Sequence, residues 1–296
     1  MRPLLLALLL ALLLACSPAW AQNAHRPHPA APPAAAPAAA AARSPLVETA
    51  GGRMVAPDIA RILNQGELVI AMLASDAPPF FFVKNGVLGG TDVDLANRIG
   101  KELGVAVRFE RSATTFDGVV DAVAAGRADL GISRLARTLK RSQIVHFSSP
   151  YMRLGHALLI NRMRFAALAG DQSLPQVIRG FSGTIGVIAG SSWEEFGQRN
   201  FPHAKLVSFP TWPDAVAAAK AGTVVAAYRD ELEVLQVVRN DPGLALSLRT
   251  VTFNDLESPL CVMVGIRDPT LLSFVNEVIA QWAEKPTVSS VLKPIK

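Results

Sequence analysis

Strand and helix patterns alternate regularly between residues 67 and 151, and this alternation constrains the fold more than any other feature. Short runs of β-branched and aliphatic residues predict buried strands at 67–73, 105–110 and 129–133. A helical pattern between the first two ends at Gly104, and residues 116–125 form a second one that ends at Gly126. Strands alternating with helices of about ten residues predict parallel sheets with helices on both faces.

The second half of the folded region repeats this theme. The segment DAVAAGRADLGIS (residues 121–133) is echoed by DAVAAAKAGTVVAAYRD (residues 214–230), and each combines an amphipathic helix, a stop and a strand. Because the recurrence is only twofold, it predicts two similar α/β lobes and not a solenoid. Ser192 and Glu195 have the spacing of a capping box at a helix start. Further strands are predicted at 155–160, 184–188, 205–209, 224–228 and 260–266.

Composition excludes several classes of function. The 296 residues include 29 Lys and Arg against 24 Asp and Glu, a formal charge of +5. The basic residues are spread along the chain, so nucleic-acid binding is not indicated, and the mild positive bias favours anionic or zwitterionic ligands. Of the two cysteines, Cys16 lies near the N-terminus, which leaves Cys261 alone in the apolar run LCVMVGI as a buried small hydrophobe.

The N-terminus predicts export across the inner membrane to the periplasm. Arg2 precedes an apolar run at residues 4–15 that is too short for a permanent membrane span. In one alternative, a signal peptide of residues 1–21 is cleaved after Ala21. In the other, residues 1–15 are a lipoprotein signal and Cys16 is acylated as a lipid anchor. Residues 22–54, rich in Ala and Pro at their start, are predicted to be a disordered linker.

Motifs of common enzymes are missing from the sequence. There is no GxSxG elbow, Walker loop or HExxH helix, and the Gly-rich segment GVLGGTD at 86–92 lacks dinucleotide-binding spacing. His146 lies in a strand-like VHF segment and is expected to be structural. We therefore expect no catalytic residues, no metal and no cofactor.

The run from residue 67 to the FSSPY segment that ends at Tyr151, with GSS at 190–192 and AAYRDE at 226–231, resembles the family 3 solute-binding proteins of the periplasm. The resemblance implies a type II periplasmic-binding fold, in which two α/β lobes with mostly parallel sheets are joined by a two-strand hinge around a ligand cleft. It places lobe one at 55–153 plus 257–296 and lobe two at 154–258. It also implies that the protein captures an amino acid or related small polar solute and delivers it to the membrane permease of an ABC transporter.

The same resemblance implies which residues bind the ligand. Arg141 follows Asp129 by twelve residues, the spacing at which the family's arginine binds the ligand carboxylate. A guanidinium suits that role because it can form two parallel hydrogen bonds with a carboxylate. Asp230 corresponds to the acceptor of the ligand's ammonium group, although it would also suit a helix N-terminus. Together the two residues would close the lobes around a zwitterion.

Further candidates accompany this pair. Phe116 matches an aromatic wall for the ligand, with a core role as its alternative, and Ser191 and Ser192 match a helix start that meets the carboxylate. Ser133 ends the strand that leads to Arg141. Arg134 and Ala136 stand where the family often has a small and a hydroxyl residue, and Ala77 replaces an aromatic. These departures suggest a more acidic, differently shaped or non-amino-acid ligand, and nearby Asp76 is a candidate partner for an amine.

The sequence leaves two other functions open. The same fold hosts periplasmic dehydratases, so an enzyme resembling cyclohexadienyl dehydratase is the first alternative, with Glu257 and Arg141 as the groups to test. The second alternative is a sensor or interaction component that uses the cleft for a partner protein.

Overall fold

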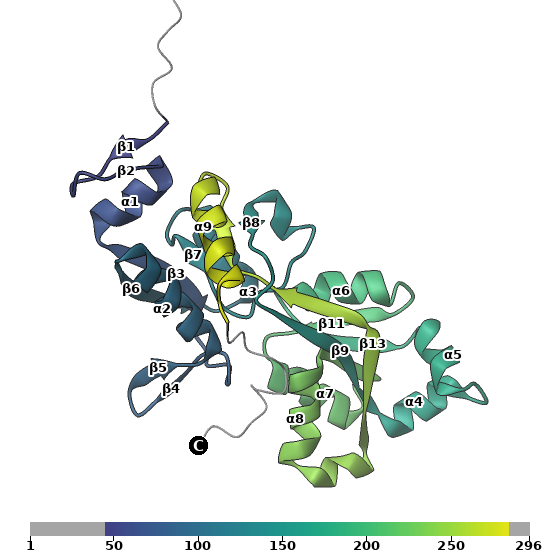
Figure 1. Ribbon diagram of the computed structural model, residues 1–296. Helices are drawn as coiled ribbons and strands as arrows, with labels where there is room; N and C mark the ends of the chain where they lie inside the picture. Colours follow the sequence, from purple (N-terminus) through teal and green to yellow (C-terminus); the bar gives the residue numbers. More distant parts are fainter. Residues whose placement is uncertain (1–44, 284–296) are drawn as a thin grey trace, which may run out of the picture. The chain divides into compact units, whose positions relative to one another are not determined.

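The computed structural model describes residues 45–283 (Figure 1). The predicted signal peptide, Cys16, most of the linker and the end of the predicted lobe one lie outside the described residues. The predicted linker extends too far, because Val47–Glu48 (β1) and Met54–Val55 (β2) already form an antiparallel pair. The turn between them is tied to the first helix, since the backbone N–H of Ala50 donates to Asn64 Oδ1 at 2.8 Å.

Five strands in the order β6-β3-β7-β14-β8 make the sheet of the first lobe. Their bounds are Glu67–Leu73 (β3), Ala106–Ala113 (β6), Leu130–Gly131 (β7), Val145–Phe147 (β8) and Met263–Gly265 (β14). A small hairpin, Phe82–Lys84 (β4) and Val87–Gly89 (β5), stands apart from this sheet. The helices of this lobe are Pro57–Gln65 (α1), Thr91–Leu103 (α2), Phe116–Ala124 (α3) and Pro269–Ala280 (α9), with a 3₁₀ turn at Arg141–Gln143 (η1).

The sheet of the second lobe has the order β11-β10-β12-β9-β13. Its strands are Met152–Asn161 (β9), Thr184–Ile188 (β10), Lys205–Phe209 (β11), Ala226–Asp230 (β12) and Leu248–Leu260 (β13). Its helices are Arg162–Ala169 (α4), Leu174–Arg179 (α5), Ser192–Asn200 (α6), Trp212–Ala221 (α7) and Glu231–Asn240 (α8), with a 3₁₀ turn at Pro242–Leu246 (η2).

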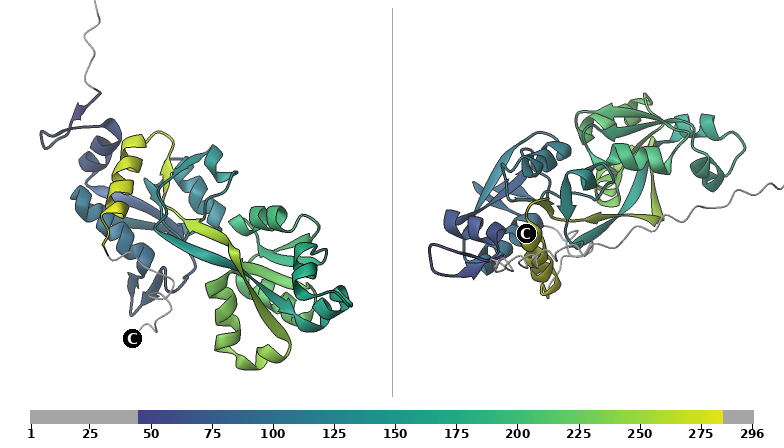
Figure 2. Two further views of the ribbon diagram at one scale, coloured as in Figure 1. Left: turned by 45° about the vertical axis from the view of Figure 1, so that its right-hand side comes forward. Right: turned by 90° about the horizontal axis from the view of Figure 1, so that it is seen from above.

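Two long strands connect the lobes. The chain leaves the first sheet after β8 and enters the second through β9, then returns through β13 to β14 (Figures 1 and 2). β9 and β13 pair antiparallel along most of their length, with a register shift between Thr252 and Glu257. The predicted two-lobed α/β fold with a two-strand hinge is therefore confirmed.

The sheets are less uniformly parallel than the alternation of elements predicted. In each sheet two strand pairs are parallel and two are antiparallel. The antiparallel pairs all involve strands at or beside the two crossovers, namely β8, β9, β13 and β14. A connection that passes to the other lobe and comes back reverses direction, whereas strand–helix–strand units within one lobe keep their strands parallel.

Helix α2 shows how the core positions a functional segment. Its apolar face, including Leu95, Ile99 and Leu103, is buried against the first sheet and α9. The helix starts after Gly90, whose φ of 121° suits glycine, and it ends at the left-handed Gly104 as expected from the sequence. Its first turn carries Asp92, which is fully buried and contacts the loop after β7.

Candidate ligand-binding site

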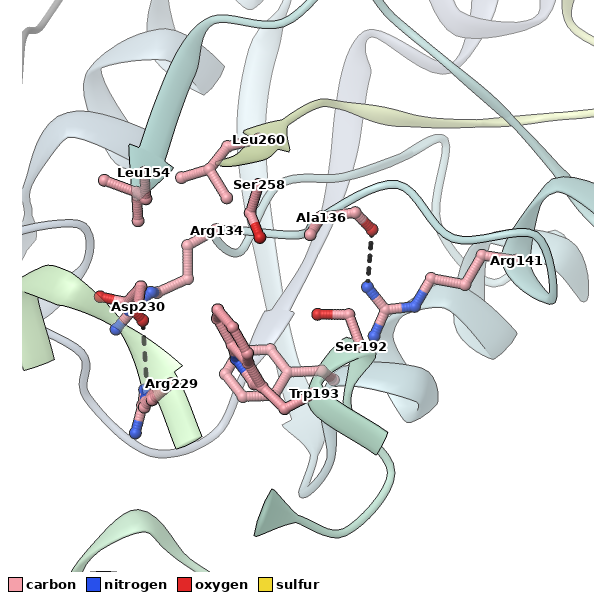
Figure 3. A pocket seen from close by; sticks show the side chains of 11 residues that line it. Arg134, Ala136, Arg141, Leu154, Ser192, Trp193, Arg229, Asp230, Ser258 and Leu260 are labelled. Atoms are coloured by element: carbon pink, nitrogen blue, oxygen red, sulfur yellow. Dashed lines mark hydrogen bonds and ion pairs between the residues drawn. The ribbon is translucent and has the colours of Figure 1, made fainter. Parts of the chain in front are cut away.

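Residues from both lobes and from the hinge strands line one cavity of about 350 Å³ (Figure 3). The part of it that a water-sized sphere can occupy is about 20 Å³, enough for about one water molecule, so in this conformation the lining side chains nearly fill the cavity. Larger hollows of about 1110 Å³ and 960 Å³ adjoin it, sharing Phe116 and Arg141 respectively with its lining. The cavity is lined by Phe116, Arg134, Ala136 and Arg141 from the first lobe, by Leu154, Ser258 and Leu260 from the hinge, and by Ser192, Trp193, Arg229 and Asp230 from the second lobe.

Arg141 begins the turn η1, where its backbone N–H donates to Thr138 Oγ1 at 3.1 Å. The side chain is 3% exposed. Its Nε and Nη2 donate to Asp117 Oδ1 at 3.0 and 2.8 Å, and its Nη1 donates to the carbonyl of Ala136 at 2.9 Å. A guanidinium has five N–H groups, so two of them, one on each Nη, make no hydrogen bond within the described residues. These two form a fork that suits a carboxylate.

Asp117 holds this guanidinium in place. Burial by itself would raise the pKa of Asp117, but Arg141 and Lys140 outweigh it, so the pKa lies below its usual value. Burial also lowers the pKa of Arg141, an effect that Asp117 opposes. The two charges therefore depend on each other. Asp117 was not predicted from the sequence, although its position directly after Phe116 at a helix start was a usable signal.

Asp230 ends β12 and caps helix α8, since its Oδ1 accepts the backbone N–H of Glu233 at 3.2 Å. Its Oδ2 lies 2.5 Å from Nη2 of Arg134, which comes from the other lobe. Arg134 also contacts Glu233 through Nη1. Burial opposes the charge on Arg134, yet Asp230 and Glu233 raise its pKa. Arg141 and Asp230 thus line one cavity, but a side chain of the protein already neutralises Asp230.

Three further contacts join the lobes beside the cavity. The backbone N–H groups of Leu139 and Lys140 donate to the carboxylate of Glu195 at 2.8 and 3.2 Å. The N–H of Asp117 donates to the carbonyl of Gly190 at 2.9 Å. The predicted capping box is therefore wrong, because Glu195 contacts the opposite lobe and the side chain of Ser191 caps α6 instead.

The other predicted site residues fall into two groups. Phe116, Arg134, Ala136 and Ser192 line the cavity with Arg141 and Asp230. Ser133, Ser191 and Asp76 do not. Ser133 is fully buried and accepts the N–H of Leu73 at 3.1 Å, and Ser191 lines the adjoining hollow of about 960 Å³. Asp76 lies at the outer hollow of about 1110 Å³, where it pairs with Arg111 at 2.8 Å.

Several lining residues were not predicted from the sequence. Trp193 follows the predicted serines in α6, and Leu154, Ser258 and Leu260 come from the hinge strands. Arg229 directly precedes Asp230, and its side chain is 7% exposed. Nε of Arg229 has no hydrogen-bond partner within the described residues, and it lies 3.4 Å from Asp230 Oδ2. Arg229 and Asp230 are neighbours at the end of the buried strand β12. Because side chains alternate between the two faces of a strand, only one of the two was expected to face the cavity.

A cluster of polar and aromatic side chains packs against residues that line the cavity. His156 of β9 bonds Tyr228 through Nδ1 and Ser258 through Nε2, the latter at 2.7 Å. Its ring also packs edge-on against Trp193 at 4.9 Å between centroids. Burial, with a smaller contribution from the charge of Arg199, lowers the pKa of His156 to about 4. The imidazole is therefore neutral in the folded protein at neutral pH.

Because His156 is neutral in the folded protein, we expect the protein to lose stability in acid. Because the pKa of His156 is depressed in the folded state, its contribution is present above about pH 6.5 and is lost as the pH falls towards 4. The free energy of unfolding of the native chain should fall by about 3 kcal/mol more than that of His156→Gln between pH 7 and pH 4. Urea unfolding at both pH values measures this difference.

The contribution of Asp92 to the free energy of unfolding changes with pH in the opposite direction to that of His156. Burial raises the pKa of Asp92 to about 7, although the N–H of Arg134 and the hydroxyl of Tyr151 partly offset it, so its contribution is lost as the pH rises through 7. That effect is common to both proteins and cancels in their difference. His146→Gln, at an exposed histidine, is the matched control and should keep the native pH dependence. Equal pH dependence in all three proteins would contradict the prediction.

The family model for bacterial extracellular solute-binding proteins, family 3, matches residues 68–293. This chain belongs to that family. It is 25% identical to the L-cystine-binding protein TcyJ of Escherichia coli over 233 residues, covering 78% of this chain and 83% of that protein. The structure of holo ArgBP from T. maritima matches with a TM-score of 0.61 and 27% identity, covering 78% and 96% of the two chains.

An enzyme also occurs among the relatives. Cyclohexadienyl dehydratase of Pseudomonas aeruginosa is 27% identical over 154 residues, which cover 51% of this chain and 54% of that enzyme. Most of the relatives compared are binding proteins. This chain is therefore an extracellular solute-binding protein by family, with a cavity between its lobes. Within the described residues, no group of His, Cys, Asp and Glu is placed to hold a metal ion, and no helix has the length and hydropathy to cross a membrane.

Proposed function

We propose that this protein captures a small polar solute, an amino acid or a related compound, and delivers it to an ABC transporter permease. The observation that carries this proposal is the buried guanidinium of Arg141, which presents two unbonded N–H groups to a cavity between two hinged lobes. Relatives named as binding proteins for L-cystine and arginine support the same class of ligand. Closure of the lobes would shield the solute from water and give the permease a distinct shape to recognise.

The proposal places the protein in the periplasm, a location that the family's extracellular role supports. We favour cleavage after Ala21, with a mature chain that starts near Gln22. Acylation of Cys16 is the alternative, and it would tether the same receptor to the membrane by its lipid. Residues 45–283 are the same in either form.

A thermal-shift screen of the purified mature chain tests the proposal. The screen covers amino acids, amines and small mono- and dicarboxylates, because a compound that binds only the folded state raises its stability. A true solute at one hundred times its Kd should stabilise the fold by about 2.7 kcal/mol and raise Tm by about 5–10 °C. A Tm that no small solute moves would instead favour a sensor or interaction component whose cleft receives a partner protein.

The dehydratase relative motivates one alternative, an enzyme of the same fold. Glu257, the acid suggested by the sequence, does not serve this alternative well. Its side chain is 56% exposed in β13, where it lies 3.6 Å from Arg153, and it does not line the cavity. The carboxylate that does line the cavity, Asp230, is paired with Arg134. Turnover of cyclohexadienyl acids by the purified chain would establish the enzyme and displace the receptor proposal.

A further inference from the structure

Asp230 is the sole carboxylate residue in the lining of the 350 Å³ cavity within the part of the chain described, and both of its oxygens already accept hydrogen bonds. Arg134 Nη2 lies 2.5 Å from Oδ2, and Arg229 Nε lies 3.4 Å from the same atom. Figure 3 shows the side chain of Arg134 directed towards Asp230, with Arg229 beside them. An ammonium group brought to this carboxylate would therefore meet two guanidinium groups of like charge.

The position of Arg134 is built into the fold. Its backbone N–H donates to Asp92 Oδ2 at 2.6 Å, and Asp92 also accepts the hydroxyl of Tyr151 at 2.9 Å. Its φ of 42° lies in the left-handed region, which a residue other than glycine rarely adopts. The guanidinium carbon stacks 4.7 Å from the centroid of the Phe80 ring, and the side chain is 3% exposed. Such a side chain is held at both ends and is shielded from solvent.

The groups of the lining that lack partners are hydrogen-bond donors. Arg141 has two N–H groups that make no hydrogen bond among the described residues, whereas Arg229 Nε already faces Asp230 Oδ2 at 3.4 Å. Donors of this kind require an acceptor such as a carboxylate. The carboxylate of Asp230, by contrast, already has hydrogen-bond partners. The cavity thus offers binding to a ligand's carboxylate and denies it to a ligand's amine.

We infer that Arg134 occupies the position of a ligand's amino group, so that the protein selects carboxylate solutes that lack an α-ammonium group. This inference rests on the proposed function, because it names the class of solute for the same cavity. Arg134 then acts as a specificity-determining residue. Its guanidinium gives the carboxylate of Asp230 a charged partner from within the protein. It also bridges the lobes, as the ammonium group of a bound zwitterion otherwise would.

Matched pairs of ligands test the inference. Each pair joins an L-amino acid with the acid of the same skeleton that lacks the amino group: L-glutamate with glutarate, L-alanine with propionate, and L-phenylalanine with 3-phenylpropionate. Isothermal titration of the native chain should show at least tenfold tighter binding of the amino-free acid in the pair that fits the cavity. Arg134→Gly, which suits the positive φ, should reverse that preference by at least tenfold.

Arg137→Gly is the matched control. It removes the same charge from the same loop, but Arg137 is exposed and stacks on Phe147 outside the cavity. It should keep the native preference. Arg134→Gln, which keeps most of the side-chain volume, replaces Arg134→Gly if the glycine variant does not fold.

The outcomes separate this inference from the proposed function. An amino acid that binds the native chain as tightly as its amino-free partner overturns the inference and leaves the receptor proposal standing. An unchanged preference in the Arg134 variants also overturns the inference. A native chain that binds no compound of either series, and whose Tm no solute of the thermal-shift screen moves, overturns both.

Discussion

Replacing Arg141 with alanine is expected to weaken solute binding by about one hundred- to ten-thousand-fold. The two free N–H groups of the buried guanidinium can each form a charge-assisted hydrogen bond with the solute carboxylate, at about 1.5–3 kcal/mol per bond. Alanine removes both bonds and the positive charge that attracts the carboxylate. Isothermal titration with the best solute from the thermal-shift screen measures the loss.

The control for this prediction is Lys140→Ala. Lys140 neighbours Arg141 and contacts the same carboxylate, Asp117, at 2.9 Å, but its side chain is 76% exposed. An exposed ion pair contributes little, so binding should change less than threefold, about 0.6 kcal/mol. Arg141→Ala should remain folded, because Lys140 still faces Asp117. Undiminished binding by a folded Arg141→Ala protein would remove this arginine from the site.

Replacing Gly90 with alanine is expected to destabilise the fold by about 3–6 kcal/mol. A Cβ atom at this position would lie 2.4 Å from the carbonyl oxygen of Phe80 and 2.7 Å from that of Pro79. Both neighbours are backbone atoms, so no rotamer change can relieve the overlap. The φ of 121° adds strain for any residue with a side chain. Chemical denaturation measures the loss.

Gly104 provides the matched control at the other end of helix α2. Its φ is 79°, but a Cβ there would meet no atom within 4 Å. Gly104→Ala should therefore show only the backbone strain of the left-handed conformation, about 1–2 kcal/mol. Similar losses in the two variants would mean that the backbone around Phe80 can move aside. Because α2 also presents Asp92 to Arg134, the Gly90 variant should weaken solute binding as well.

Local patterns predicted much of the fold. The strands at 67–73, 184–188 and 205–209 match β3, β10 and β11 in both bounds. The helix stop at Gly104 is also as predicted. These signals are reliable because they depend on neighbours in the chain, namely alternating or continuous apolar residues and a glycine in the left-handed region.

The longest strand of the second lobe escaped prediction. β13 spans Leu248–Leu260, whereas the sequence predicted a strand only from residue 260. It lies at the edge of its sheet, paired with β9 alone, and many of its residues are exposed. An edge strand that also serves as a hinge needs little apolar surface, so its sequence carries little of the usual signal. For the same reason the crossing of the chain between lobes came only from the family resemblance.

The sequence by itself determined two α/β lobes and the helix stops, because these follow from short-range periodicity, and its resemblance to the family implied the arginine and the aspartate that line a common cavity. Only the tertiary structure decided which group neutralises Asp230. Arg134 lies 96 residues away along the chain and reaches it across the cleft. Such an ion pair depends on how two separately folded sheets meet, and no local pattern records that distance. The bonds that Arg141 makes and those it leaves for a solute were decided in the same way, by the atoms packed around it.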